Sequence, residues 1–242
     1  MIAGRRCAGR HVCDSIADMT LLNREALSDG SLRERLDMPA DVAWSAEQLE
    51  QSMAETLAAR PAGPLRVFGY GSLMWNPLLH FDERRVATLE GWQRSFCMRT
   101  VIGRGRPERP GRMLSLEPGG RVQGVALRLR EPEVEHELRL LWRREMLAGA
   151  YRPLWVTLTL DGGDAVPALV FVARPGHTMY EADSSVATVA PLVATAAGAF
   201  GPNVDYLRAL ARALAAEGLA DERVDALLAA VDAQPAPQAA AP

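Results

Sequence analysis

Glu145 is the side chain whose position most favours chemistry. Four apolar residues precede it by 11, 7, 4 and 3 positions: Val134, Leu138, Leu141 and Trp142. At this spacing they share one helical face with Glu145, whereas the nearby acids Glu133, Glu135 and Glu137 mostly fall away from that face. A carboxylate among apolar side chains holds its proton more tightly, which suits a general base or acid near neutral pH. A buried ion pair with one of the many arginines is the alternative interpretation.

A turn with two glycines is the second candidate. A predicted strand ends in Gly69-Tyr70-Gly71-Ser72, and backbone N–H groups in such a turn can face one concavity and bind a carboxylate or an oxyanion. The pattern is not a dinucleotide-binding loop, because Met74 stands where the third glycine would be. It is not a nucleophile elbow either, because Tyr70 occupies the position two residues before Ser72. A tight turn without a ligand is the alternative.

Three other groupings carry weaker chemical signals. Cys7, His11 and Cys13 lack a fourth ligand for a metal site. Ser72 has no local histidine or aspartate that would complete a catalytic triad. The arginines of the loop at 104–112 are expected to be a solvated surface, with a lid over an anionic substrate as the alternative.

Composition limits the classes of function. The chain has 242 residues, 48% hydrophobic and 24% charged, with a net charge of -3, which is typical of a soluble globular protein and gives no electrostatic reason to bind nucleic acid. No apolar run reaches the roughly 20 residues that span a bilayer, and the first residues do not resemble a secretory signal. All 27 residues counted as lysine or arginine are arginine, which excludes Schiff-base lysine chemistry and a complete Walker A loop. Three cysteines do not make a disulfide framework, so we expect a reduced, cytoplasmic setting.

The elements that would position these residues follow from periodicity and turn signals. We expect strands at 65–68 and 86–101, the second broken near Gly91, then a hairpin of 112–116 and 121–130 around Pro118-Gly119-Gly120, and another of 155–160 and 165–173. One helix is expected to begin with a capping box at Ser45 and Gln48. Three further helices are expected at 132–147, 203–217 and 221–230. The pattern predicts an α+β fold with an antiparallel or mixed sheet. We divide the chain into an extension at 1–62 with one helix, a main domain at 63–232 and a disordered tail at 233–242.

Four segments together resemble the ChaC family of glutathione-specific γ-glutamylcyclotransferases. They are FGYGSLMWNP at 68–77, GRMLSL at 111–116, LLWRREMLAGAY at 140–151 and GPNVDYL at 201–207. The helix in the extension also resembles bacterial members. The resemblance implies a small mixed β-barrel with flanking helices.

The resemblance also implies a site. It makes Glu145 the catalytic glutamate and the backbone of Tyr70, Gly71, Ser72 and Leu73 the holder of the γ-glutamyl group. Tyr151 and Tyr206 would line the site. Ala150 stands where some members have a second glycine, which is a small change.

The implied reaction is an intramolecular cyclisation. Glu145 would take a proton from the α-amine, which attacks the γ-carbonyl of the same residue and releases 5-oxoproline and Cys-Gly. No step requires a metal, a nucleotide or a hydride carrier. Two alternatives stay open: a cyclotransferase for other γ-glutamyl amines or amino acids, and a non-catalytic regulator that binds a small ligand.

Overall fold

The computed structural model describes residues 21–234. The three-residue grouping of Cys7, His11 and Cys13, and residues 235–242 of the expected tail, lie outside the described residues. Across the described part of the chain, no helix has the length and apolar character needed to cross a bilayer.

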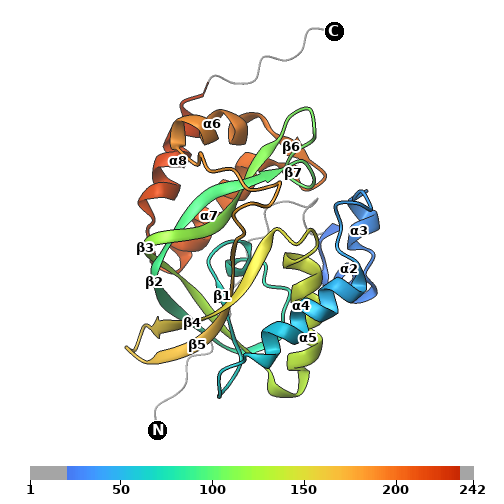
Figure 1. Ribbon diagram of the computed structural model, residues 1–242. Coiled ribbons are helices and arrows are strands. Elements are labelled where there is room, and N and C mark those ends of the chain that lie inside the picture. The colour runs from blue at the N-terminus through green and yellow to red at the C-terminus, as the bar shows by residue number, and fades with distance from the viewer. Residues whose placement is uncertain (1–20, 235–242) are drawn as a thin grey trace.

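A closed barrel of five strands forms the centre of the molecule (Figure 1). Its strand order is β1-β3-β2-β4-β5, and the barrel closes where β5 pairs with β1 in parallel, at Val67 and Leu169. The strands are β1 at Arg66–Gly69, β2 at Phe81–Thr100, β3 at Gly111–Leu129, β4 at Tyr151–Leu160 and β5 at Ala165–Ala173. The other neighbours pair antiparallel, so the predicted mixed barrel with flanking helices is confirmed.

β2 and β3 are long, bent strands, and here the sequence prediction was wrong. Pro118-Gly119-Gly120 does not turn a hairpin: it lies inside β3, opposite the place where the register of β2 shifts between Glu90 and Trp92. Gly91, Gly119 and Gly120 all have positive φ, a conformation that glycine adopts without strain. Glycines in a strand interior often mark a bulge or a bend, and here they lie where both strands bend. The true β2–β3 connection is the arginine-rich loop at 101–110.

The part of β2 and β3 beyond the bend supports a layer of C-terminal helices (Figure 1). These are α6 at Val186–Thr195, α7 at Asn203–Ala216 and α8 at Glu222–Asp232, with a two-residue ladder of β6, Ala197–Gly198, and β7, Gly201–Pro202, between α6 and α7. The last two helices agree with the prediction. Sequence analysis missed α6, because Pro191 interrupts an otherwise apolar segment that has no polar face to give helical periodicity.

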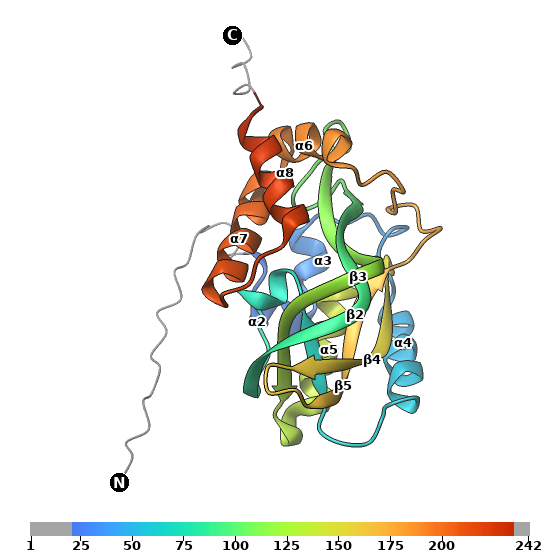
Figure 2. The ribbon, with the colours of Figure 1, turned by 90° about the vertical axis from the view of Figure 1, so that its left-hand side faces the viewer.

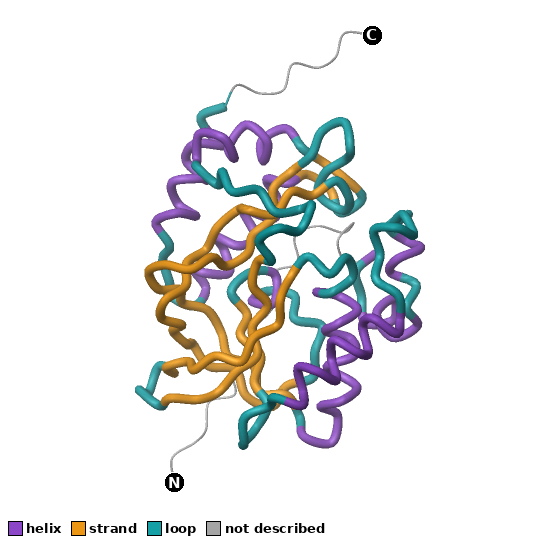
Figure 3. The backbone as a smooth tube through the Cα atoms, in the orientation of Figure 1, coloured by secondary structure: helices purple, strands orange, loops and turns teal. Residues whose placement is uncertain are grey.

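A second group of helices covers the other side of the barrel (Figures 2 and 3). Here α4, Ala46–Ala58, packs with α5, Val134–Glu145, and the short helices α2, Arg24–Asp29, and α3, Leu32–Arg35, lie nearby. The capping box is confirmed, since Gln48 N donates to Ser45 Oγ and Ser45 N to Gln48 Oε1. The extension thus contains α2 and α3 besides the one expected helix. The division of the chain at residue 62 stays a prediction.

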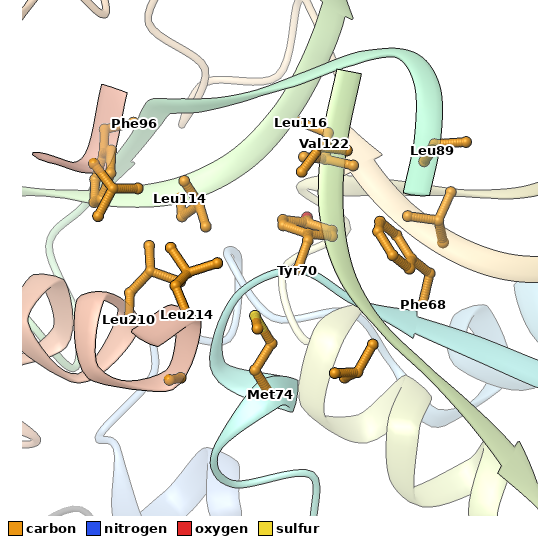
Figure 4. Packing of buried hydrophobic residues seen from close by; sticks show 14 of the residues in the cluster. Phe68, Tyr70, Met74, Leu89, Phe96, Leu114, Leu116, Val122, Leu210 and Leu214 are labelled. Carbon is orange, nitrogen blue, oxygen red and sulfur yellow. The ribbon is translucent and has the colours of Figure 1, made fainter. Parts of the chain in front are cut away.

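Two apolar clusters hold these layers on the barrel. In the first, Figure 4 shows Tyr70 and Met74 packed near Leu114 and Leu116 of β3 and Leu210 of α7. The second packs the apolar face of α5 against β1 and β5, where the rings of Trp142 and Phe171 meet edge to face at 5.2 Å. Because Tyr70 belongs to the first cluster and Leu73 to the second, the glycine turn lies where the two cores meet.

Candidate active site

Glu145 is the last residue of α5, and its side chain is only 17% exposed. The apolar face predicted for the helix is present, because Leu138, Leu141 and Trp142 are buried in the second apolar cluster, between α5 and the barrel. Burial raises the pKa of Glu145, while the neighbouring charge of Arg144 opposes that rise. The structure therefore places a sheltered carboxyl group with an elevated pKa at the end of the helix.

An ion pair also exists at this position, so both interpretations of Glu145 have a basis in the structure. Arg144 Nε lies 3.1 Å from Glu145 Oε1. The same guanidinium donates to Ser72 Oγ at 2.9 Å and to the carbonyls of Asn76 and Pro77 at 2.6 and 3.0 Å. Glu145 thus shares its partner with the glycine turn, and the pair connects α5 to the segment that follows β1.

The glycine turn leaves β1 and enters a short 3-10 helix at Ser72–Met74. Met74 N donates to the carbonyl of Gly71, which begins the helix, so the N–H groups of the first residues have no acceptor within it. Space at Gly71 is tight: a Cβ there would lie 3.0 Å from the Tyr206 hydroxyl and 3.3 Å from Leu114 Cδ2. The turn therefore runs directly beneath Tyr206.

Three tyrosines surround the same point. Tyr70 and Tyr206 are buried and Tyr151 is half-buried. Burial raises the pKa of all three hydroxyls, and the negative charge of Glu145 raises each further. Tyr70 donates to the Phe171 carbonyl at 2.6 Å, and Tyr151 donates to the Leu114 carbonyl at 3.3 Å.

The structure thus brings together the residues that sequence analysis selected for the site. Glu145, the three tyrosines and the turn meet between the end of α5, the end of β1 and the start of α7. Tyr206 comes from the layer of C-terminal helices, whereas Glu145 comes from the helices on the other side of the barrel. The site therefore lies where these two helical groups meet.

The arginine-rich loop differs from the solvated surface expected by default. Arg104 and Arg112 are 4% and 6% exposed, and Arg104 donates to the Pro202 carbonyl at 3.0 Å. The buried amide of Asn203 holds the backbone of Arg112 on both sides, through its Oδ1 and its Nδ2. Only the tip at 106–109, which includes Arg106 and Arg109, is exposed, and both ends of the loop are fixed to the start of α7.

Comparison with known proteins places this arrangement in a family. A model described as ChaC-like protein matches residues 65–234. The chain belongs to the ChaC family. Among curated relatives, the glutathione-specific gamma-glutamylcyclotransferase of Escherichia coli (strain K12) is 51% identical over 189 residues, which cover 78% of this chain and 82% of the relative. Glutathione-specific gamma-glutamylcyclotransferase 1 of Danio rerio is 33% identical, covering 61% of this chain and 77% of the relative.

Solved structures agree on the fold of this ChaC family member. A yeast gamma-glutamyl cyclotransferase specific to glutathione superposes with a TM-score of 0.64, covering 70% of this chain and 98% of the yeast chain. At 21% identity this likeness concerns the fold alone.

Two residues of the site were missed by sequence reasoning. Arg94 is buried behind the turn, where its guanidinium donates to the Tyr70 carbonyl at 2.9 Å and to Asp221 at 2.8 Å. Nothing in the sequence separates Arg94 from the other arginines. Arg144 had one signal, its position beside Glu145, but helical neighbours point in different directions and the pattern did not predict a contact.

One group in the described part of the chain has the composition of a metal site, away from Glu145. Ligand atoms of His80, Glu133 and Glu137 lie within 4.8 Å of one another. However, Arg24 binds both oxygens of Glu137 at 2.7 and 2.8 Å, and His80 N donates to the same carboxylate at 2.9 Å. Because these donors already compensate the buried charge, the group is best described as an ion-pair cluster between α2 and α5.

Proposed function

We propose that this ChaC family member is a glutathione-specific γ-glutamylcyclotransferase, which converts glutathione to 5-oxoproline and Cys-Gly. The observation that carries the proposal is the position of Glu145: one sheltered carboxyl group beside the glycine turn and three tyrosines. The name and 51% identity of the Escherichia coli relative support the same substrate.

The proposed roles follow from the geometry. The backbone of Tyr70 to Leu73 holds the γ-glutamyl group, because N–H groups at the start of a helical turn suit a carboxylate or an oxyanion. Tyr151 and Tyr206 line the site and exclude water from it. Burial keeps the pKa of their hydroxyls high, so these groups stay neutral; the Tyr151 hydroxyl donates to the Leu114 carbonyl, and the Tyr206 hydroxyl faces the glycine turn.

Glu145 acts as the general base and then as the general acid. It takes a proton from the substrate α-ammonium group, and the freed amine attacks the γ-carbonyl carbon of the same residue. A new C–N bond closes the five-membered ring, and Glu145 passes its proton to the departing nitrogen as the amide bond to cysteine breaks. The ring nitrogen then gives up a second proton to leave the neutral lactam, and the released amine of Cys-Gly takes up that proton as its ammonium form. The attack is intramolecular, so little orientational entropy is lost at the transition state. The balance needs no water and no redox partner, and we expect turnover to persist in the presence of a chelator.

Incubation of the purified chain with glutathione tests the proposal. We expect stoichiometric 5-oxoproline and Cys-Gly, measured by mass spectrometry. Parallel incubations with a γ-glutamyl amino acid and a γ-glutamyl amine address the alternative substrates, and strong preference for either over glutathione would contradict the proposed specificity. Binding of glutathione without any cyclised product would favour the non-catalytic regulator.

We also propose that the protein works in the cytoplasm. The support is the sparse cysteine content and Cys97, which is buried and free within the described residues.

A further inference from the structure

We propose that Arg144 is a positioning residue, which fixes Glu145 and the glycine turn relative to each other. The inference rests on the proposed function, because it concerns the distance between the base and the substrate amine held by the turn.

The contacts of Arg144 show the connection. Its side chain is 5% exposed, and all three guanidinium nitrogens have partners. Nε faces Glu145 Oε1, Nη2 donates to Ser72 Oγ, and Nη1 donates to the carbonyls of Asn76 and Pro77. A planar guanidinium can satisfy such a divergent set at once, whereas the single ammonium group of lysine cannot.

These contacts also orient the groups on either side. Arg144 occupies Oε1 of Glu145, so Oε2 is the oxygen we assign to the substrate amine. The Ser72 hydroxyl accepts from Arg144, and its own proton is therefore available for donation to substrate. One side chain thus sets the direction of two groups that lie 73 positions apart in the chain.

The charge of Arg144 gives the inference a distinctive signature. Burial raises the pKa of Glu145, and Arg144 lowers it. Loss of the guanidinium charge leaves the burial effect unopposed, so the pKa of Glu145 rises further and a larger fraction of the base is protonated at a given pH. The acid limb of the kcat/KM profile, which reports the base of the free enzyme, then moves to higher pH.

The neighbouring arginine is a matched control. Arg143 has the same side chain on the same helical turn, but it donates to the carbonyls of Leu27 and Ser28 in α2. Arg143→Met therefore removes the hydrogen bonds between α5 and α2 but leaves the contacts of Glu145 and of the glycine turn in place.

The experiment compares Arg144→Met, Arg144→Lys and Arg143→Met with the unchanged chain. We expect Arg144→Met to lower kcat by roughly a hundredfold, the scale of a small misplacement of reacting groups, and to move the acid limb to higher pH. Arg144→Lys keeps the positive charge but not the branched guanidinium. The acid limb of the kcat/KM profile should therefore return towards its original pH, while kcat stays low. Arg143→Met should leave the limb in place. Circular dichroism and thermal unfolding establish that each variant is folded.

A titration of Glu145 tests the role of Arg144 without relying on activity. The carboxyl carbon of Glu145, followed by NMR as a function of pH, should titrate at higher pH in Arg144→Met than in the unchanged chain. An unchanged titration and acid limb in Arg144→Met, or an equal shift in Arg143→Met, would overturn the inference. If Arg144→Met does not fold, Arg144→Lys decides: near-original kcat would overturn the role of the fork. If the unchanged chain makes no 5-oxoproline, the proposed function fails, and the titration alone tests whether Arg144 controls Glu145.

Discussion

The indole of Trp44 lies over Gly149, where a Cβ on that glycine would come within 2.1 Å of the ring. The backbone N–H of Trp44 also donates to the Leu147 carbonyl at 2.9 Å. The segment before the barrel therefore packs against the loop that directly follows Glu145. Since Gly149 has a φ of 63°, the loop depends on this glycine for both space and conformation.

Gly149→Ala should destabilise the protein by about 2 kcal/mol, because it combines a left-handed backbone with a clash against Trp44. Thermal or denaturant unfolding measures the change. In the Trp44→Ala background the clash is absent, so the loss of unfolding free energy caused by Gly149→Ala should fall to the cost of the left-handed backbone alone. Strictly additive effects of the two substitutions would show that the indole does not restrict this position.

Glu145→Gln preserves the shape of the side chain and removes the base. We expect the variant to fold and its turnover of glutathione to fall by roughly a hundredfold or more, the range of general-base catalysis. Glu135→Gln, on the exposed face of α5, is the matched control and should retain turnover. Near-original turnover in Glu145→Gln would remove the basis for the proposed mechanism.

Gly71→Val should obstruct the glycine turn, because its side chain would meet the Tyr206 hydroxyl and Leu114. We expect KM for glutathione to rise by at least tenfold, the scale of a displaced binding group, measured by steady-state kinetics with unfolding as a stability check. Gly162→Ala provides the comparison. Gly162 lies in the distant β4–β5 turn, and a Cβ there would meet mainly the flexible end of the Arg85 side chain. Glutathione binding as tight as in the unchanged chain would mean that the turn does not hold the substrate.

Arg24→Met should test the ion-pair cluster beneath α5. The Glu137 side chain is fully buried; burial raises its pKa, but the bonds from Arg24 and His80 outweigh this and hold the pKa below its usual value. The pair therefore stabilises the fold above the ordinary pKa of glutamate, and this contribution is lost as the pH falls through the lowered value. Without Arg24 the carboxylate stays buried and poorly compensated, which should cost about 3 kcal/mol at neutral pH.

The pH dependence of that cost gives a second measurement. In Arg24→Met the unpaired Glu137 takes up a proton more readily, so the difference in unfolding free energy from the unchanged chain should shrink as the pH is lowered from 7 to 5. Arg33→Met in α3 is the control and should show no such trend, because the half-buried Arg33 is not among the residues that act on Glu137. A pH-independent difference would mean that the charge of Glu137 is not what Arg24 compensates.

Glu145 illustrates what periodicity can predict. The spacing of four apolar residues placed it on a buried helical face, and the structure has that face. The same reasoning placed Glu137 mostly away from that face and did not address what covers it: the side chain is 0% exposed, and Arg24 of α2 binds it. A helical wheel describes one partner surface, whereas α5 has two, and the second depends on residues more than 100 positions away.

Long-range contacts explain the other differences. Pro118-Gly119-Gly120 has the composition of a turn, but pairing with β2 on both sides keeps β3 continuous, and no local signal reports that pairing. Arg94 and Tyr206 are similar cases, since their roles depend on a packing of α7 and α8 that is visible only in three dimensions. Tyr206 was selected only through the family resemblance.

The bend in β2 and β3 makes one pair of strands serve two layers. The paired segments 81–90 of β2 and 121–129 of β3 form part of the barrel, whereas the paired segments 92–100 and 111–118 carry the helices that supply Tyr206. A fragment ending before α6 would keep the base but uncover Leu114 and Leu116. A single residue inserted into β3 between Leu116 and the bend would turn those leucines to the opposite face of the strand, where the buried Ser115 lies, since side chains alternate along a strand. Insertions and deletions are therefore best accommodated in the exposed turns, such as the β4–β5 turn, because the number of residues along β2 and β3 fixes the separation between the barrel and the C-terminal helices.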